Sequence, residues 1–271
     1  IKAIEFDVLI SKDNIPVLFH DYTLNTNMVK DENGNWIDNF DLKIMDLTYD
    51  QISNYSIESL KPGSGYSDRF KNQKSVEGAK IPKLIDLFKL ANKENYKDVF
   101  LNLEVKSNPI LKDVTPEPKE MVTTILKDIK DYNLEDRIVV TSFDWRILYE
   151  LKKQNPNVLR GFLTLQQNLG STKKNIYENS PWINKEFSME ELFLLPNIIK
   201  SIEGHVWSAF YRDITKQNVE LAHKQGLAVN VWTVNREQDI IRMIEYGVDG
   251  IITDYPKKVQ EICKSKNISW F

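Results

Sequence analysis

The feature that most constrains the fold of this chain is a repeated alternation of strand and helix patterns. Strand patterns cover residues 1–9, 99–106, 137–142, 160–164, 205–208, 227–234 and 249–254. A pattern of apolar residues at helical spacing follows each of these seven strands. Repeated strand–helix units of this length predict an α/β fold with a parallel sheet, and eight of them would close a TIM-type (β/α)8 barrel. One unit is missing, and we expect this first unit to precede Ile1.

The chain length fits a single domain of this type. Its 271 residues are close to the roughly 250 residues of one barrel, so we expect one domain over residues 1–271. A short strand, Pro16–His20, follows the first strand. Residues 25–79 then show turn signals and few sustained apolar periods. We interpret residues 25–79 as a loop-rich subdomain inserted into the barrel.

Local signals mark the ends of two helices. Ser188, followed three residues later by Glu191, has the capping-box arrangement that starts a helix. Asn235 with Gln238 predicts the start of another helix. Gly247 should close this second helix, because glycine readily adopts the left-handed conformation found at helix ends.

Charge and hydropathy exclude several classes of partner. The formal net charge is −3, from 36 basic and 39 acidic residues that are interspersed along the chain, so no positive field attracts nucleic acid. No apolar run approaches the 18 or more residues of a membrane span, and the start has no signal-peptide pattern. We expect no nucleic-acid partner and no stable membrane insertion. The sequence does not decide the cellular compartment, because a processed exported chain also lacks its signal. It does not decide the oligomeric state either.

Four acidic residues are candidates for a cation site. Glu5 and Asp7 are two residues apart on one strand, so their side chains project from the same face. Glu104 and Asp254 also lie near predicted strand ends, where the loops of a barrel surround a common cavity. Oxygen ligands without cysteine suit Mg²⁺ or Ca²⁺ better than Zn²⁺. Such an ion can bind a phosphate oxygen and neutralise charge that develops during displacement.

Glu104 is the most informative of these carboxylates. It is the only charged residue in the segment Val99–Val105, which reads as a buried strand. A buried carboxylate is costly unless it is paired or binds a metal. Lys106 lies on the same face two residues later, and the sequence leaves open whether it pairs with Glu104 or holds a phosphate oxygen.

Histidine and tryptophan residues near the predicted cavity are further candidates. His20 ends an apolar run just after the Glu-x-Asp strand, where an imidazole could protonate a leaving alkoxide, although it could also be a hydrogen-bonded core histidine. His223 reads as a surface residue on a helix, and His205 opens a strand. Trp232 faces the cavity if the strand alternates regularly, but an aromatic residue there could also be part of the core.

Several ordered blocks together resemble one enzyme family. They are IEFDV at 4–8, KDNIPVLFHD at 12–21, TL at 23–24, IPKL at 81–84, LNLEVK at 101–106, VNVWTVN at 229–235 and GVDGIITDYP at 247–256. In this order they resemble the glycerophosphodiester phosphodiesterases, within the larger superfamily of phospholipase C-like phosphodiesterases. The blocks PGSGYSDRF at 62–70 and WSAFYRD at 207–213 are similar to a bacterial branch whose members are often exported.

The resemblance implies a barrel with a small inserted subdomain, a bound Mg²⁺ or Ca²⁺ ion, and hydrolysis of small glycerophosphodiesters to glycerol 3-phosphate and an alcohol. It also implies a periplasmic or secreted location, with the cytoplasm not excluded. The subdomain would shape the substrate opening. The roles that carry over are metal binding for Glu5, Asp7 and Glu104, acid/base catalysis for His20, phosphate contact for Lys106 and a pocket position for Trp232.

The chain departs from the family pattern at its start. The family begins with a strand that ends in His-Arg-Gly, and no such segment stands before Ile1. That segment would supply a second acid/base histidine and an arginine suited to phosphate. We expect it in a part of the protein upstream of Ile1, because a barrel of seven units would leave two sheet edges and apolar surface uncovered.

Three functional hypotheses follow. The first is metal-dependent hydrolysis, with either water or the glycerol hydroxyl of the substrate as the nucleophile. The second is a phospholipase D-like lyase of the same superfamily, which forms a cyclic phosphate. The third is a truncated, catalytically inactive barrel that only binds ligand. The sequence does not identify the head-group alcohol.

Overall fold

The computed structural model describes residues 2–170 and 172–269. The chain divides into two compact units. The first contains Ile1–Glu5, Asp98–Val105 and Leu134–Phe271, and the second contains Phe6–Lys97 and Lys106–Asn133. Strand β1, Ala3–Ile10, runs without a break from the first unit into the second.

Every predicted strand is present in a sheet with the order β2-β1-β3-β4-β5-β6-β7-β8. The strands after β1 are β2 (Pro16–Leu18), β3 (Phe100–Val105), β4 (Ile138–Ser142), β5 (Leu159–Thr164), β6 (Val206–Phe210), β7 (Ala228–Trp232) and β8 (Gly250–Ile251). Strands β3 to β8 are successive parallel neighbours, which confirms the predicted α/β class. Closure into an eight-unit barrel, with a first unit before Ile1, stays a prediction.

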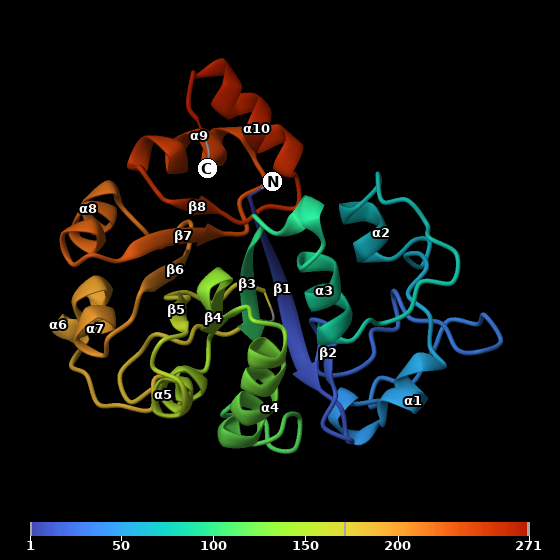
Figure 1. The fold of residues 1–271 in the computed structure, drawn as a ribbon. Coiled ribbons are helices and arrows are strands. Elements are labelled where there is room, and N and C mark those ends of the chain that lie inside the picture. The colour runs from blue at the N-terminus through green and yellow to red at the C-terminus, as the bar shows by residue number, and fades with distance from the viewer. Residues whose placement is uncertain (1, 171, 270–271) are drawn as a thin grey trace. The chain divides into compact units, whose positions relative to one another are not determined.

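Helices follow the parallel strands as the alternation predicts (Figure 1). They are α3 (Leu84–Ala91), α4 (Pro118–Asp131), α5 (Trp145–Gln154), α6 (Met189–Leu192), α7 (Leu195–Ser201), α8 (Lys216–Lys224), α9 (Glu237–Tyr246) and α10 (Pro256–Ser265). Apolar faces hold them to the sheet. The rings of Trp145 in α5 and Phe162 in β5 meet edge to face with centroids 5.0 Å apart, a favourable aromatic geometry.

The two local helix signals had different outcomes. The capping box at the start of α6 is confirmed, because Glu191 N donates to Ser188 Oγ and Ser188 N donates to Glu191 Oε2. Helix α9, in contrast, begins at Glu237 rather than at Asn235. The Asn235 side chain instead binds the segment after β8, where it accepts from Thr253 Oγ1 and donates to the Asp254 carboxylate. Gly247 ends α9 with φ of 78°, as predicted.

The second unit has its own apolar core on the hairpin of β1 and β2. Its buried residues include Leu9, Val17 and Phe19 from this hairpin and its continuation, packed with Val29 and Ile52 from further along the chain. Within residues 25–79 the regular structure is limited to the short helices α1 (Tyr49–Ser53) and α2 (Gly65–Arg69) and one 3-10 turn. This segment is loop-rich as predicted, whereas its interpretation as an inserted subdomain stays a prediction.

None of the helices in the described ranges is both long enough and apolar enough to cross a membrane.

Candidate metal and phosphate site

Strand β1 presents two carboxylates on one face. Phe6 and Val8 are buried on the opposite face, while Glu5 and Asp7 are half-buried, as the alternation of side chains along a strand requires. The strand continues past Asp7 because Val8 to Ile10 pair antiparallel with β2. The two carboxylates therefore lie within the strand rather than at its end.

Strand β3 runs parallel to β1 and brings a third carboxylate beside them. Phe100 N donates to Lys2 O at 2.9 Å near one end, and Lys106 N donates to Val8 O at 3.0 Å near the other. Glu104 lies between these two hydrogen bonds. Its side chain is buried, with 9% of the residue exposed, although its neighbours on the strand are apolar.

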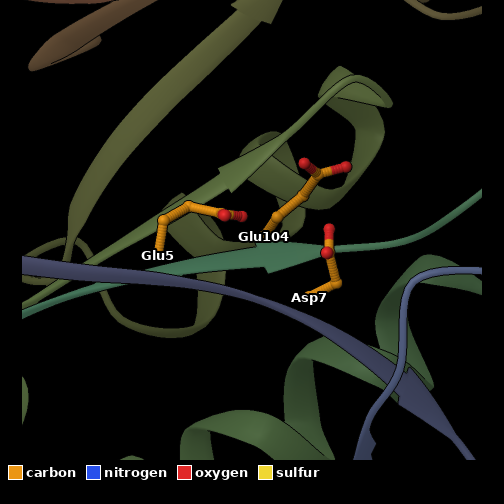
Figure 2. Close-up of side chains that lie close together, drawn as sticks. All are labelled: Glu5, Asp7 and Glu104. Carbon is orange, nitrogen blue, oxygen red and sulfur yellow. The ribbon is translucent and has the colours of Figure 1, made fainter. Parts of the chain in front are cut away.

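The three predicted metal ligands come together in this arrangement. Glu5, Asp7 and Glu104 each offer a carboxylate oxygen, and these oxygens lie within 4.8 Å of one another (Figure 2). Negative charges at this distance repel each other, and burial strengthens the repulsion. A hard divalent cation relieves it and prefers carboxylate oxygens as ligands. The donor set therefore fits a bound Mg²⁺ or Ca²⁺ ion.

Asp254 is the fourth predicted carboxylate. Within the described part of the chain, it does not belong to the group formed by Glu5, Asp7 and Glu104. It follows β8, and its carboxylate accepts a hydrogen bond from Asn235 Nδ2 at 2.7 Å. Its contact is structural, because it ties the end of the sheet to the segment before α9.

Lys106 and His20 meet beside Asp7. Lys106 Nζ lies 3.7 Å from Asp7 Oδ1 and 3.5 Å from His20 Nε2. Burial leaves only about a tenth of the lysine side chain exposed, whereas the His20 side chain is 66% exposed. The geometry thus joins a buried cation to an accessible imidazole next to the carboxylate group.

Asp21 orients the imidazole. His20 Nδ1 lies 2.6 Å from Asp21 Oδ1, and Asn25 Nδ2 donates to Asp21 Oδ2 at 2.6 Å. With the Nδ1 proton directed to Asp21, Nε2 is the nitrogen that exchanges a proton with its surroundings. No role was predicted for Asp21, although its position directly after His20 was a signal for one.

The same contacts shift two pKa values. The hydrogen bond with Asp21 raises the pKa of His20 above its ordinary value, and this effect outweighs burial and the nearby Lys106 charge, which both lower it. Burial alone would raise the pKa of the Asp21 carboxyl, but the hydrogen bonds from His20 and Asn25 hold that pKa below its ordinary value. The pair therefore favours a protonated imidazole beside an ionised carboxylate.

Trp232 ends β7 among aromatic side chains. Its ring centroid lies 5.2 Å from that of Phe143 and 5.3 Å from that of Phe210, and its Nε1 donates to Ser208 O at 3.1 Å. The residue is half-buried. These contacts fix the indole rigidly, and its predicted pocket role stays a prediction.

The other two histidines have structural contacts. His205 Nδ1 accepts from Arg160 N at 3.1 Å, and burial lowers the pKa of His205. His223 Nε2 lies 2.9 Å from Asp249 Oδ2, and the His223 side chain is partly exposed, in agreement with its interpretation as a surface residue.

Comparisons with known proteins identify the family of the chain. The model of the glycerophosphoryl diester phosphodiesterase family matches residues 1–258. A glycerophosphodiester phosphodiesterase from Caldanaerobacter subterraneus subsp. tengcongensis is 31% identical over 255 residues, which are 94% of this chain and 83% of that protein. These matches extend over nearly the whole chain.

Solved structures give the same result. A crystal structure from Silicibacter pomeroyi DSS-3, named as a glycerophosphoryl diester phosphodiesterase, is 32% identical with a TM-score of 0.86, and covers 100% of this chain and 86% of that one. A phosphodiesterase from Oleispira antarctica, solved with the product sn-glycerol-3-phosphate, shares the fold at 21% identity and a TM-score of 0.66, over 96% of this chain and 84% of that one. The chain therefore belongs to the glycerophosphoryl diester phosphodiesterase family and is an enzyme of that class.

Proposed function

We propose that this enzyme hydrolyses small glycerophosphodiesters to glycerol 3-phosphate and an alcohol with the help of a divalent metal ion. The observation that carries the proposal is the convergence of Glu5, Asp7 and Glu104, with Lys106 and His20 adjacent to Asp7. Displacement at a phosphodiester requires ligands for a metal ion, a cation for the phosphate charge and an accessible proton carrier, and these residues supply all three. The product complex of the Oleispira antarctica relative supports glycerol 3-phosphate as the product.

Glu5, Asp7 and Glu104 would hold the ion, which is Mg²⁺ or Ca²⁺ in this proposal. When bound, it supplies Lewis-acid polarisation of a phosphate oxygen. The carboxylates on β1 and β3 are fixed by strand pairing, so the protein does not have to reorganise them as charge develops.

Lys106 contacts a phosphate oxygen and so neutralises part of the substrate charge. Its ammonium group already lies near Asp7, and burial keeps water from screening its charge. His20, exposed and protonated with the support of Asp21, gives its proton to the leaving alcohol. Trp232 forms part of the pocket wall.

The organisation of the chain also belongs to the proposal. Residues 25–79 act as an inserted subdomain of a single barrel domain and shape the substrate opening. A periplasmic or secreted location is supported by the resemblance of residues 62–70 and 207–213 to exported bacterial members.

Incubating the protein with glycerophosphocholine and Mg²⁺ or Ca²⁺ is expected to release glycerol 3-phosphate, and EDTA should abolish the release because it removes the ion from the carboxylate group. Phosphorus NMR of the reaction separates three mechanisms. A phosphomonoester as the first product supports direct hydrolysis, and a transient cyclic phosphate supports attack by the glycerol hydroxyl. Accumulation of a cyclic phosphate would refute hydrolysis and support the lyase hypothesis. Binding of the substrate without turnover would support a barrel that only binds ligand.

Replacing Asp21 with Asn should move the basic limb of the pH profile of kcat/KM to lower pH. The hydrogen bond from His20 to Asp21 raises the pKa of His20, so its weakening lowers that pKa. Because His20 acts in its protonated form, activity falls as pH rises through its pKa, and it falls earlier in the variant. Profiles of the two proteins between pH 5 and 9 (on the order of two units either side of the ordinary histidine value) measure the shift.

The matched control is Asp249→Asn. Asp249 also pairs with a histidine, His223, at 2.9 Å, but this pair takes no part in the proposed reaction. Its profile should superimpose on that of the unmodified protein. A shift of the Asp21→Asn profile to higher pH would contradict the acid role of His20.

A further inference from the structure

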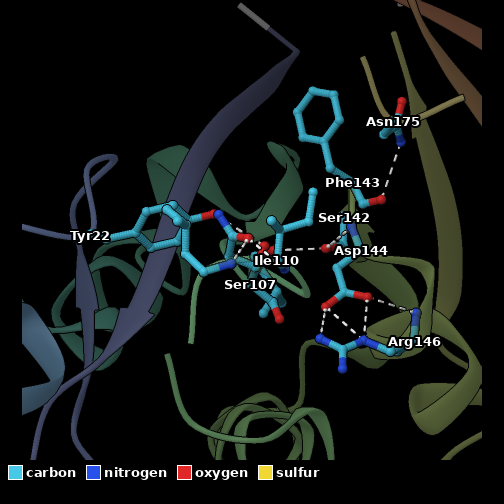
Figure 3. Close-up of polar contacts among 11 residues, drawn as sticks. Tyr22, Ser107, Ile110, Ser142, Phe143, Asp144, Arg146 and Asn175 are labelled. Carbon is cyan, nitrogen blue, oxygen red and sulfur yellow. Dashed lines mark hydrogen bonds and ion pairs between the residues drawn. The ribbon is translucent and has the colours of Figure 1, made fainter. Parts of the chain in front are cut away.

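The main chain around Lys106 is held by side-chain hydroxyl groups. Strand β3 ends at Val105, so Lys106 lies just beyond regular pairing. Ser142 Oγ donates to the carbonyl of Val105 at 2.8 Å, and Tyr22 Oη donates to the carbonyl of Ser107 at 3.1 Å (Figure 3). Together with the hydrogen bond from Lys106 N to Val8 O, these contacts fix the backbone on both sides of the lysine.

Ser142 is itself locked in place. It is completely buried at the end of β4, and its Oγ accepts a hydrogen bond from Asp144 N at 3.1 Å. Asp144 is also buried and accepts charge-assisted hydrogen bonds from the Arg146 guanidinium, the shortest of them 2.9 Å from Nε and 2.7 Å from Nη2. Because the Ser142 oxygen accepts from Asp144 N, the hydroxyl hydrogen is free to point at the carbonyl of Val105.

Tyr22 is fixed from the other side. Its ring packs against the apolar core of the second unit, and only one residue, Asp21, separates it from His20. The hydroxyl at the end of this rigid ring therefore ties Ser107 to the segment that carries the imidazole. This tie accords with the distance of 3.5 Å between Lys106 Nζ and His20 Nε2.

A lysine depends on such support more than most phosphate ligands do. Its ammonium group sits on a flexible four-carbon stem, so the position of the charge follows from the backbone and from packing. Misplacement of a substrate-positioning group by about 1 Å can cost about a hundredfold in rate.

We propose that Tyr22 and Ser142 are positioning residues, which hold Lys106 where its ammonium group meets the substrate phosphate. This inference rests on the proposed function, because it assumes the phosphate contact of Lys106. In this proposal neither hydroxyl touches the substrate. Each acts through one main-chain carbonyl next to the lysine.

The test replaces each hydroxyl alone, in Tyr22→Phe and Ser142→Ala. Each variant should lower kcat/KM for glycerophosphocholine about tenfold, because the lysine charge is displaced from the position where it meets the phosphate. Ser265→Ala is a matched control, since Ser265 Oγ also donates to a carbonyl, that of Ile262, at 2.8 Å. Ser201→Ala is the second control, since Ser201 Oγ donates to Ile198 O at 2.7 Å. Both controls should keep normal kinetics.

A double-mutant cycle with Lys106→Ala separates positioning from general destabilisation. If the hydroxyls act through the lysine, their removal should have no further effect once Lys106 is Ala. Equal losses in both backgrounds, or no loss in the single variants, would overturn the inference.

The same double-mutant cycle can be measured without turnover, by calorimetry of glycerol 3-phosphate binding in the presence of Mg²⁺ or Ca²⁺. It keeps the two proposals distinguishable. A protein that shows the coupling in binding but does not hydrolyse glycerophosphocholine would refute the proposed function alone. If Lys106→Ala changes neither binding nor activity, the phosphate contact is refuted and the inference falls with it.

Discussion

Replacing Glu104 with Gln is expected to lower kcat/KM for glycerophosphodiesters by about a thousandfold or more. The substitution keeps the volume of a buried side chain, which is 9% exposed, and removes only its negative charge. Loss of one of three metal ligands weakens ion binding and with it the stabilisation of transition-state charge. That stabilisation is worth several kcal/mol, and about 4 kcal/mol corresponds to a thousandfold.

The same variant should have a second effect that does not require turnover. Without metal, the carboxylates of Glu5, Asp7 and Glu104 repel each other within 4.8 Å, so Glu104→Gln should raise the melting temperature of the metal-free protein. Added Mg²⁺ or Ca²⁺ should raise the melting temperature of the unmodified protein but have little effect on the variant, because stabilisation by a ligand follows its affinity.

Glu150→Gln is the matched control for both measurements. Glu150 is a largely buried carboxylate in α5 that pairs with Lys153, with 16% of its side chain exposed. It lies outside the carboxylate group, so its replacement should leave activity and the metal response unchanged. Full activity of Glu104→Gln would refute the assignment of Glu104 as a metal ligand.

Most of the fold was predictable because it follows from local periodicity. Apolar patterns identified every strand of the sheet and its alternation with helices, and the Ser188 and Glu191 pair identified the start of α6. The start of α9 was not predictable in this way. Asn235 has the residue type of a helix cap, but its side chain is used by Thr253 and Asp254, which are 18 and 19 residues away. A tertiary contact displaced the local signal.

The candidate site shows the same division. The two-residue spacing of Glu5 and Asp7 and the lone charge of Glu104 in an apolar strand predicted residues that the structure brings together. Their support was not predictable. Tyr22 reaches Ser107 across 85 residues, and Ser142 reaches Val105 across 37. Hydroxyl groups that bind distant carbonyls leave no periodic trace in a sequence, and strand pairing alone decides which carbonyls they meet.

The proton donor role of His20 predicts a dependence on the leaving group. His20→Gln should lower kcat/KM for glycerophosphocholine by about 10² to 10⁴, the usual contribution of general acid catalysis. The alkoxide of a simple alcohol leaves poorly unless it is protonated. A p-nitrophenyl ester of glycerol phosphate releases a stable phenolate, so its cleavage needs no acid and should be nearly unaffected.

The comparison of the two substrates separates the acid role from every alternative. If His20 activated the nucleophile or only bound phosphate, both esters would lose activity to a similar extent, because neither role acts on the leaving oxygen. His223→Gln is the matched control, since His223 also pairs with a carboxylate but is far along the chain, in α8. It should leave both rates unchanged. A leaving-group dependence confined to His20→Gln would thus identify the side of the phosphate on which the alcohol leaves, and the exposure of His20 would give that alcohol a direct path to solvent.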